Sequence, residues 1–126
     1  MKYLFIILIS HAADEDAPKD IARKSLPLRT ALHHDPSLSS PLEQLVKLYR
    51  DANRLDELVT IYRTHVARYP ADTNANAVLI RIQLATGDPE AAQRARIAVE
   101  QNPQNAYLSF LQYQSMKSNH PAESLD

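Results

Sequence analysis

Apolar residues follow a helical period in the middle of the chain. Between Pro36 and Pro70, apolar side chains recur at i, i+3, i+4 and i+7, which predicts one helix at about 41–52 and another at about 56–68. Proline cannot continue a helix and disfavours the α region for the residue before it, so the two prolines bound this helix pair. The expected buried positions are Leu42, Leu45, Val46 and Tyr49 in the first helix, and Leu58, Ile61, Tyr62 and Val66 in the second.

The two-helix pattern is then repeated. Thr86-Gly87 ends the next helix, and Asp88-Pro89 starts the one that follows, with aspartate as the N-cap and proline at the first helical position. After Pro103 a further unit begins. The buried positions expected in these helices are Ala75, Val78, Leu79 and Ile82, then Ala91, Ala95 and Ala98, and finally Tyr107, Phe110, Leu111 and Met116.

The repeating unit is about 34 residues long, because prolines close similar phrases at that interval. Its marker positions are Leu42, Leu45, Val46, Tyr49, Tyr62 and Pro70 in one full unit, and Ala75, Val78, Leu79, Ile82, Ala91, Ala95, Ala98 and Pro103 in the next. With these residues in place, the segment 26–126 resembles the tetratricopeptide family of helix–turn–helix repeats. The resemblance implies an all-α fold, with antiparallel helix pairs stacked as a short α-solenoid. Leu58 and His65 depart from the family pattern, and a helical-hairpin repeat of another family is the structural alternative.

The composition also favours an all-helical chain. The sequence contains one glycine, Gly87, and no cysteine, so glycine-rich phosphate loops, disulfides and thiolate metal sites are excluded. The formal net charge is −1. Acidic and basic residues are interspersed, and no basic block indicates nucleic acid as a partner.

The beginning of the chain is similar to a secretory signal. Met1-Lys2 is followed by an apolar run, and Ser10 and Ala12 occupy the positions that signal peptidase reads. Cleavage after Ala12 predicts a secreted or periplasmic protein. The apolar run is too short to form a stable membrane span. The segment is also shorter than most signals, so a misassigned start and a cytoplasmic protein form the alternative.

The expected organisation has three parts. A signal peptide at 1–12 precedes a flexible lead-in at 13–25, which is charged and has few large apolar residues, and repeats occupy 26–126. The repeats divide into a partial unit at 26–36, full units at about 39–71 and 72–103, and an incomplete unit at 104–126.

No arrangement of side chains indicates catalysis. His33 and His34 are adjacent and face different sides of a helix, so they cannot chelate one metal ion well. No His-Glu-x2-His motif occurs. Asp56, Glu57 and Glu90 are explained by the preference of helix N-termini for negative charge. The sequence therefore predicts no enzyme, no metal and no cofactor.

In the resembling family, the first helices of successive units line an inner groove that takes peptides or partner helices. Amide side chains in such a groove satisfy backbone groups of an extended peptide, and cations pair with acidic groups. The alternative is that these positions are solvated faces, with Ile80 and Leu108 packed between units. The predicted groove residues are Glu43, Lys47, Arg50, Asn76, Ile80, Gln83, Leu108, Gln112 and Ser115.

The function predicted from the sequence is that of a non-catalytic scaffold that binds a peptide or helix of another protein. One alternative is the N-terminal repeat region of a larger secreted enzyme or regulatory protein whose catalytic part follows residue 126. Another is self-association, in which a second copy completes the last repeat unit.

Overall fold

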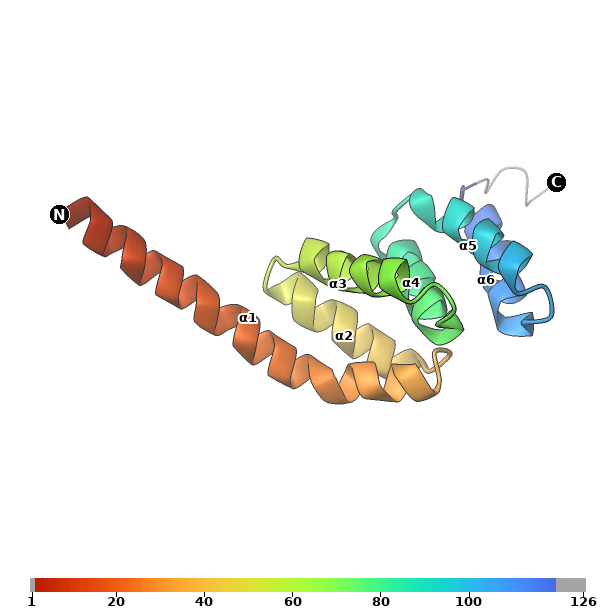
Figure 1. Ribbon diagram of the computed structural model, residues 1–126, viewed down its shortest axis with the longest axis horizontal. Coiled ribbons are helices and arrows are strands. Elements are labelled where there is room, and N and C mark those ends of the chain that lie inside the picture. The colour runs from red at the N-terminus through yellow and green to blue at the C-terminus, as the bar shows by residue number, and fades with distance from the viewer. Residues whose placement is uncertain (1, 120–126) are drawn as a thin grey trace.

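Six helices make up the part of the chain that the computed structural model describes, which is the backbone of residues 2–119 and the side chains of 18–118. The all-α prediction is confirmed for these residues (Figure 1). The helices are α1 (Lys2–His34), α2 (Ser39–Asp51), α3 (Leu55–Arg68), α4 (Thr73–Thr86), α5 (Glu90–Gln101) and α6 (Ala106–Asn119).

Helix α4 lies at the centre of the packing. It contacts all five other helices, whereas each remaining contact joins two helices that are consecutive in the chain. A helix that is apolar on most of its faces is stable only when other elements surround it, and α4 fits that description. Its buried residues are Ala75, Ala77, Val78, Leu79, Ile80, Ile82 and Gln83.

The apolar core has two parts, and α4 contributes to both. The first part joins α1, α2, α3 and α4 through large side chains such as Leu32, Leu45, Leu58 and Leu79, none of which is exposed. The second part joins α4, α5 and α6. It is built from Ala77, Ile80, Ala95, Ala98, Leu108 and Leu111. The small side chains of α5 let its neighbours approach closely.

The predicted core is largely confirmed in α2, α3, α4 and α5, with one exception. Ile61 was expected to be buried, but 39% of it is exposed. The buried stripe of α3 consists of Leu58, Tyr62 and Val66, at i, i+4 and i+8. Ile61 lies at the edge of this stripe, where it lines a pocket described below.

The predicted stripe of α6 is wrong at two of its four positions, and a third, Tyr107, is only partly buried against the core. Leu111 is buried, but Phe110 and Met116 are 50% and 56% exposed. The buried side chains are instead Leu108, Leu111 and Ser115, which lie at i, i+3 and i+7 on one face. The predicted face included the aromatic residues Tyr107 and Phe110. The face of α6 that packs against α4 and α5 carries smaller side chains instead.

Helix α1 is longer than the sequence predicted and projects beyond the other helices at its N-terminal end (Figure 1). Part of the expected flexible lead-in is helical and packed, because Ile21 and Ser25 are buried. The predicted signal cannot be compared in the same way, since Met1 and the side chains of 2–17 lie outside the described residues, as do residues 120–126. No described helix is both long and apolar enough to cross a membrane.

Gly87 ends α4 in the left-handed conformation, with φ of 73°. A side chain costs about 1–2 kcal/mol in this backbone region, although no atom lies within 4 Å of where the Cβ would be. We expect Gly87→Ala to lower the free energy of unfolding by about 1 kcal/mol, measured by urea denaturation. Asn53 also has a positive φ, of 59°, so Asn53→Gly is the control and should not destabilise. Equal losses in both variants would contradict the backbone explanation.

Candidate functional site

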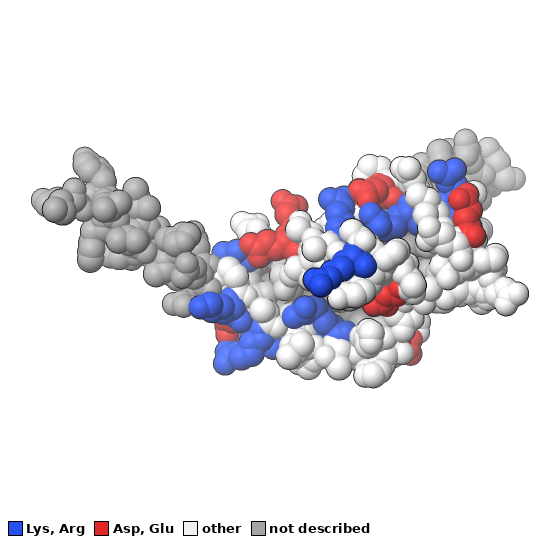
Figure 2. All heavy atoms as spheres, in the orientation of Figure 1, with Lys and Arg blue, Asp and Glu red and all other residues white. Residues whose placement is uncertain are grey.

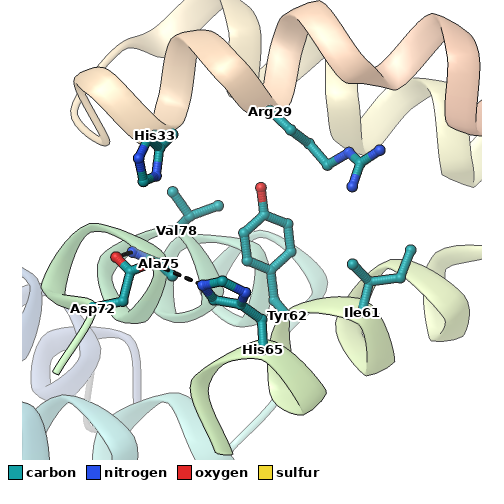
Figure 3. Close-up of a pocket in the computed structure, with 8 residues that line it drawn as sticks. All are labelled: Arg29, His33, Ile61, Tyr62, His65, Asp72, Ala75 and Val78. Atoms are coloured by element: carbon teal, nitrogen blue, oxygen red, sulfur yellow. Dashed lines mark hydrogen bonds and ion pairs between the residues drawn. The ribbon is translucent and has the colours of Figure 1, made fainter. Parts of the chain in front are cut away.

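A half-open pocket of about 170 Å³ lies between α1, α3 and α4 (Figure 3). Its lining combines five polar or charged side chains, from α1, α3 and the segment before α4, with apolar walls, a mixture typical of ligand sites. The lining residues are Arg29 and His33 of α1, Ile61, Tyr62 and His65 of α3, Asp72 before α4, and Ala75 and Val78 of α4.

Helical spacing explains why these side chains converge. Arg29 and His33 are four residues apart, so they extend from the same face of α1. Figure 3 shows them descending on either side of the Tyr62 hydroxyl, which points up from α3. His65 follows Tyr62 by three residues and therefore shares its face of α3. Two helices that are not consecutive thus present polar groups to one space.

Two hydrogen-bonded contacts hold the end of α1 against α4. The side-chain amide of Asn74 donates to the backbone oxygen of His33 over 2.7 Å. Arg81 donates to the backbone oxygens of Pro36 and Leu38, each over 2.7 Å. The carbonyls at a helix C-terminus lack partners within the helix, so these bonds fix the position of α1 and with it the roof of the pocket.

Asp72 is the N-cap of α4 and links it to α3. Its Oδ1 accepts from the backbone N–H of Ala75 over 3.0 Å, and its Oδ2 lies 2.8 Å from Nε2 of His65. Partial burial of the Asp72 carboxyl favours a higher pKa, but these hydrogen bonds and the nearby histidines outweigh it and lower the pKa below the ordinary 3.8. The carboxylate is therefore ionised at neutral pH.

The hydroxyl of Tyr62 remains protonated over the whole physiological range. Only 8% of this residue is exposed, and burial raises the pKa of its phenol to about 12, against the opposing influence of the Arg29 charge. No hydrogen-bond partner for the hydroxyl is found among the described residues, so it is a donor directed at the pocket.

The lowered pKa of Asp72 predicts that the protein loses stability at acidic pH. Because the folded-state pKa lies below the unfolded value of 3.8, ionised Asp72 stabilises the fold above that value, and this contribution is lost as pH falls through the folded-state pKa. Asparagine keeps the N-cap acceptor but does not titrate. We expect wild type to be more stable than Asp72→Asn at neutral pH, and the difference to shrink below about pH 4. Thermal unfolding across this range checks it, and a constant difference would contradict it.

The predicted groove residues do not form one surface. Glu43, Lys47 and Arg50 are exposed on α2, where Lys47 pairs with Asp51 over 2.9 Å. Gln112 is half-buried. The half-buried Asn76 uses its amide to bond the backbone oxygens of Pro70 and Asp72. The remaining four, Ile80, Gln83, Leu108 and Ser115, are buried between helices and are not available to a partner in this arrangement.

Burial of these four residues has a simple cause. Helix α4 contributes one set of side chains to the larger core and another set, which includes Ile80, to the core shared with α5 and α6. The face with Ile80 was expected to be open, but it packs against α6. Gln83 is fully buried, and neither its amide nitrogen nor its amide oxygen has a partner among the described residues. This corresponds to the alternative in which Ile80 and Leu108 pack between units.

Sequence reasoning missed the pocket itself. Tyr62, Ala75 and Val78 were assigned only to the core. His33 was considered only as a metal ligand, and His65 was named only as a departure from the repeat pattern. The spacing of Arg29 and His33 on one helical face was a usable signal, but nothing local shows that α1 and α3 lie across from each other. Among the described residues, no cluster of acidic or histidine side chains fits a metal ion.

Figure 2 shows lysine and arginine side chains interspersed with acidic ones over the visible face. Comparison of the chain with protein-family models, with curated proteins and with solved structures gave no match. The resemblance to tetratricopeptide repeats therefore depends on the residues quoted above, and the site must be interpreted from its own geometry.

Proposed function

We propose that this chain is a non-catalytic helical-repeat module, of the tetratricopeptide kind, that binds a segment of a partner protein at the pocket between α1, α3 and α4. The observation that carries the proposal is the pocket itself, whose walls come from three helices of successive predicted units. Arrays of helix pairs bind partners through surfaces that neighbouring units share. The proline interval and the contacts between consecutive helices support the repeat assignment.

The hydrogen-bond pattern of the pocket supports binding over catalysis. His65 and Asp72 form an imidazole–carboxylate pair, which is two thirds of a nucleophilic triad. A triad also needs a hydroxyl or thiol that hydrogen-bonds to the imidazole, and in the described part of the chain His65 has only Asp72 as its side-chain partner. The pair is better explained as the capped junction between α3 and α4.

A display library of random peptides tests the proposal directly. The full chain is immobilised, bound peptides are sequenced, and each enriched peptide is measured against wild type, Arg29→Ala and Arg23→Ala. Arg23 is a suitable control because it lies on α1 but is 78% exposed and pairs with Asp20. We expect a shared peptide motif whose binding is lost in Arg29→Ala and kept in Arg23→Ala. Absence of any motif would contradict the peptide-binding function, and equal binding by both variants would contradict the proposed site.

We also propose that the protein is exported, on the strength of the signal-like residues at 1–12. N-terminal sequencing of the protein from expressing cells should then read Ala13-Asp14-Glu15 as the first residues. A mature chain that retains residues 2–12 would show that no signal is removed and would favour the cytoplasmic alternative.

A further inference from the structure

The two charged side chains that line the pocket, Arg29 and Asp72, do not pair with each other. Asp72 is the only carboxylate in the lining, and both of its oxygens are engaged, one by Ala75 and the other by His65. The guanidinium of Arg29 has no carboxylate partner among the described residues, and its hydrogen bond goes to a serine hydroxyl. The guanidinium of Arg29 is therefore not held in an ion pair, and it shares the lining with the ionised Asp72, two imidazoles and a phenol.

A buried serine, Ser25, orients the guanidinium group of Arg29. Nε of Arg29 donates to Oγ of Ser25 over 3.1 Å, and Ser25 donates in turn to the backbone oxygen of Ala22 over 2.9 Å. Ser25 is fully buried and Arg29 is half-buried, so this chain of bonds is partly shielded from water. With Nε occupied, the two Nη groups remain as donors, and Figure 3 shows the guanidinium extending from α1 on the Ile61 side of Tyr62, in the same pocket lining.

We infer that the pocket receives the carboxylate of an aspartate or glutamate side chain from an extended segment of the partner, with Arg29 and Tyr62 donating hydrogen bonds to it. This inference depends on the proposed function for its biological meaning and adds the class of ligand. Planar guanidinium groups bind carboxylates through paired hydrogen bonds. Ile61, Ala75 and Val78 form the apolar part of the lining, so an apolar residue beside the acidic one fits the same site.

The number of charges favours a carboxylate over a phosphate group. One guanidinium balances a monoanion. A phosphate carries about two negative charges at neutral pH, and the ionised Asp72 in the same lining would repel it. A carboxylate meets less of this repulsion, because it carries one negative charge where the phosphate carries about two.

Small probes test the ligand class without any partner. The full chain is titrated with sodium propionate, with neutral propionamide and with inorganic phosphate at constant pH and ionic strength. The readout is the imidazole Cε1–H signals of His33 and His65 in NMR spectra. We expect propionate to shift these signals to saturation, propionamide to leave them unchanged, and phosphate to bind more weakly than propionate. Arg29→Ala should weaken propionate binding by about tenfold or more, because a charged hydrogen-bond donor is removed, while Arg23→Ala should not change it.

Two results would overturn the inference: shifts by propionamide equal to those by propionate, or phosphate binding tighter than propionate. To show that Arg29→Ala is folded, its helical circular dichroism and melting temperature are compared with those of Arg23→Ala. Loss of propionate binding by a folded Arg29→Ala variant supports the inferred role of Arg29. Arg29→Lys provides a second variant, since it retains the charge without the planar fork and should bind with intermediate affinity. Equal binding by Arg29→Lys and Arg29→Ala would argue against a charge-based site.

The two proposals fail in different ways. If the display library yields a motif without an acidic residue, the module still binds peptides but the ligand class is wrong. If propionate binds as expected and the library yields no motif, the carboxylate site stands and the peptide-binding function does not.

Discussion

Replacement of Leu79 by alanine should lower the free energy of unfolding by about 2–5 kcal/mol, which is the usual cost of a leucine-sized cavity in a packed core. Leu79 is fully buried in the larger core, on the helix that contacts all others. The surrounding helices cannot collapse onto the cavity without losing their contacts with each other. Urea denaturation followed by circular dichroism measures the loss.

Ile97→Ala is the matched control for this variant. Ile97 lies on α5 and is 41% exposed, so its truncation removes a similar volume without leaving an enclosed cavity. We expect it to cost no more than about 1 kcal/mol. A similar loss in the two variants would mean that α4 is not the centre of the fold.

The second large effect is expected at Leu108, where the structure and the sequence-based prediction disagree. Leu108 is 1% exposed and belongs to the core between α4, α5 and α6, although its position was assigned to a binding groove. Leu108→Ala should therefore destabilise the protein by about 2–5 kcal/mol. A groove residue would instead be replaced with little effect on stability.

Phe110→Ala distinguishes the two interpretations on the same helix. Phe110 was predicted to be buried, but half of it is exposed. We expect the Phe110 variant to lose much less stability than the Leu108 variant when both are unfolded under the same conditions. The opposite order would show that α6 is rotated relative to the arrangement described above.

The helices were predictable because local signals defined them. Pro36, Pro70 and Pro103 separate the helix pairs, and Gly87 ends α4 with the left-handed conformation that glycine adopts most easily. The buried stripe of α2, and the side of α4 that faces the larger core, followed from apolar spacing alone. These properties depend on neighbours in the sequence, so one sequence suffices to find them.

Neither the buried face of α6 nor the pocket could be predicted from local sequence signals. Which side of α6 is buried depends on where α4 and α5 lie, and aromatic size favoured the wrong side. The pocket depends on α1 and α3, whose residues Arg29 and Tyr62 are far apart in the chain. Its details come from contacts such as Asn74 with His33, which no periodicity encodes.

Backbone amide NMR signals, followed during titration with an acidic peptide selected from the library, test the central claim that binding occurs at this pocket. We predict that the signals that move belong to the lining of α1, α3 and α4, with Arg29, Tyr62 and Ala75 among the largest changes. Changes centred instead on the exposed α2 residues Glu43, Lys47 and Arg50 would contradict the pocket and restore the groove predicted from the sequence.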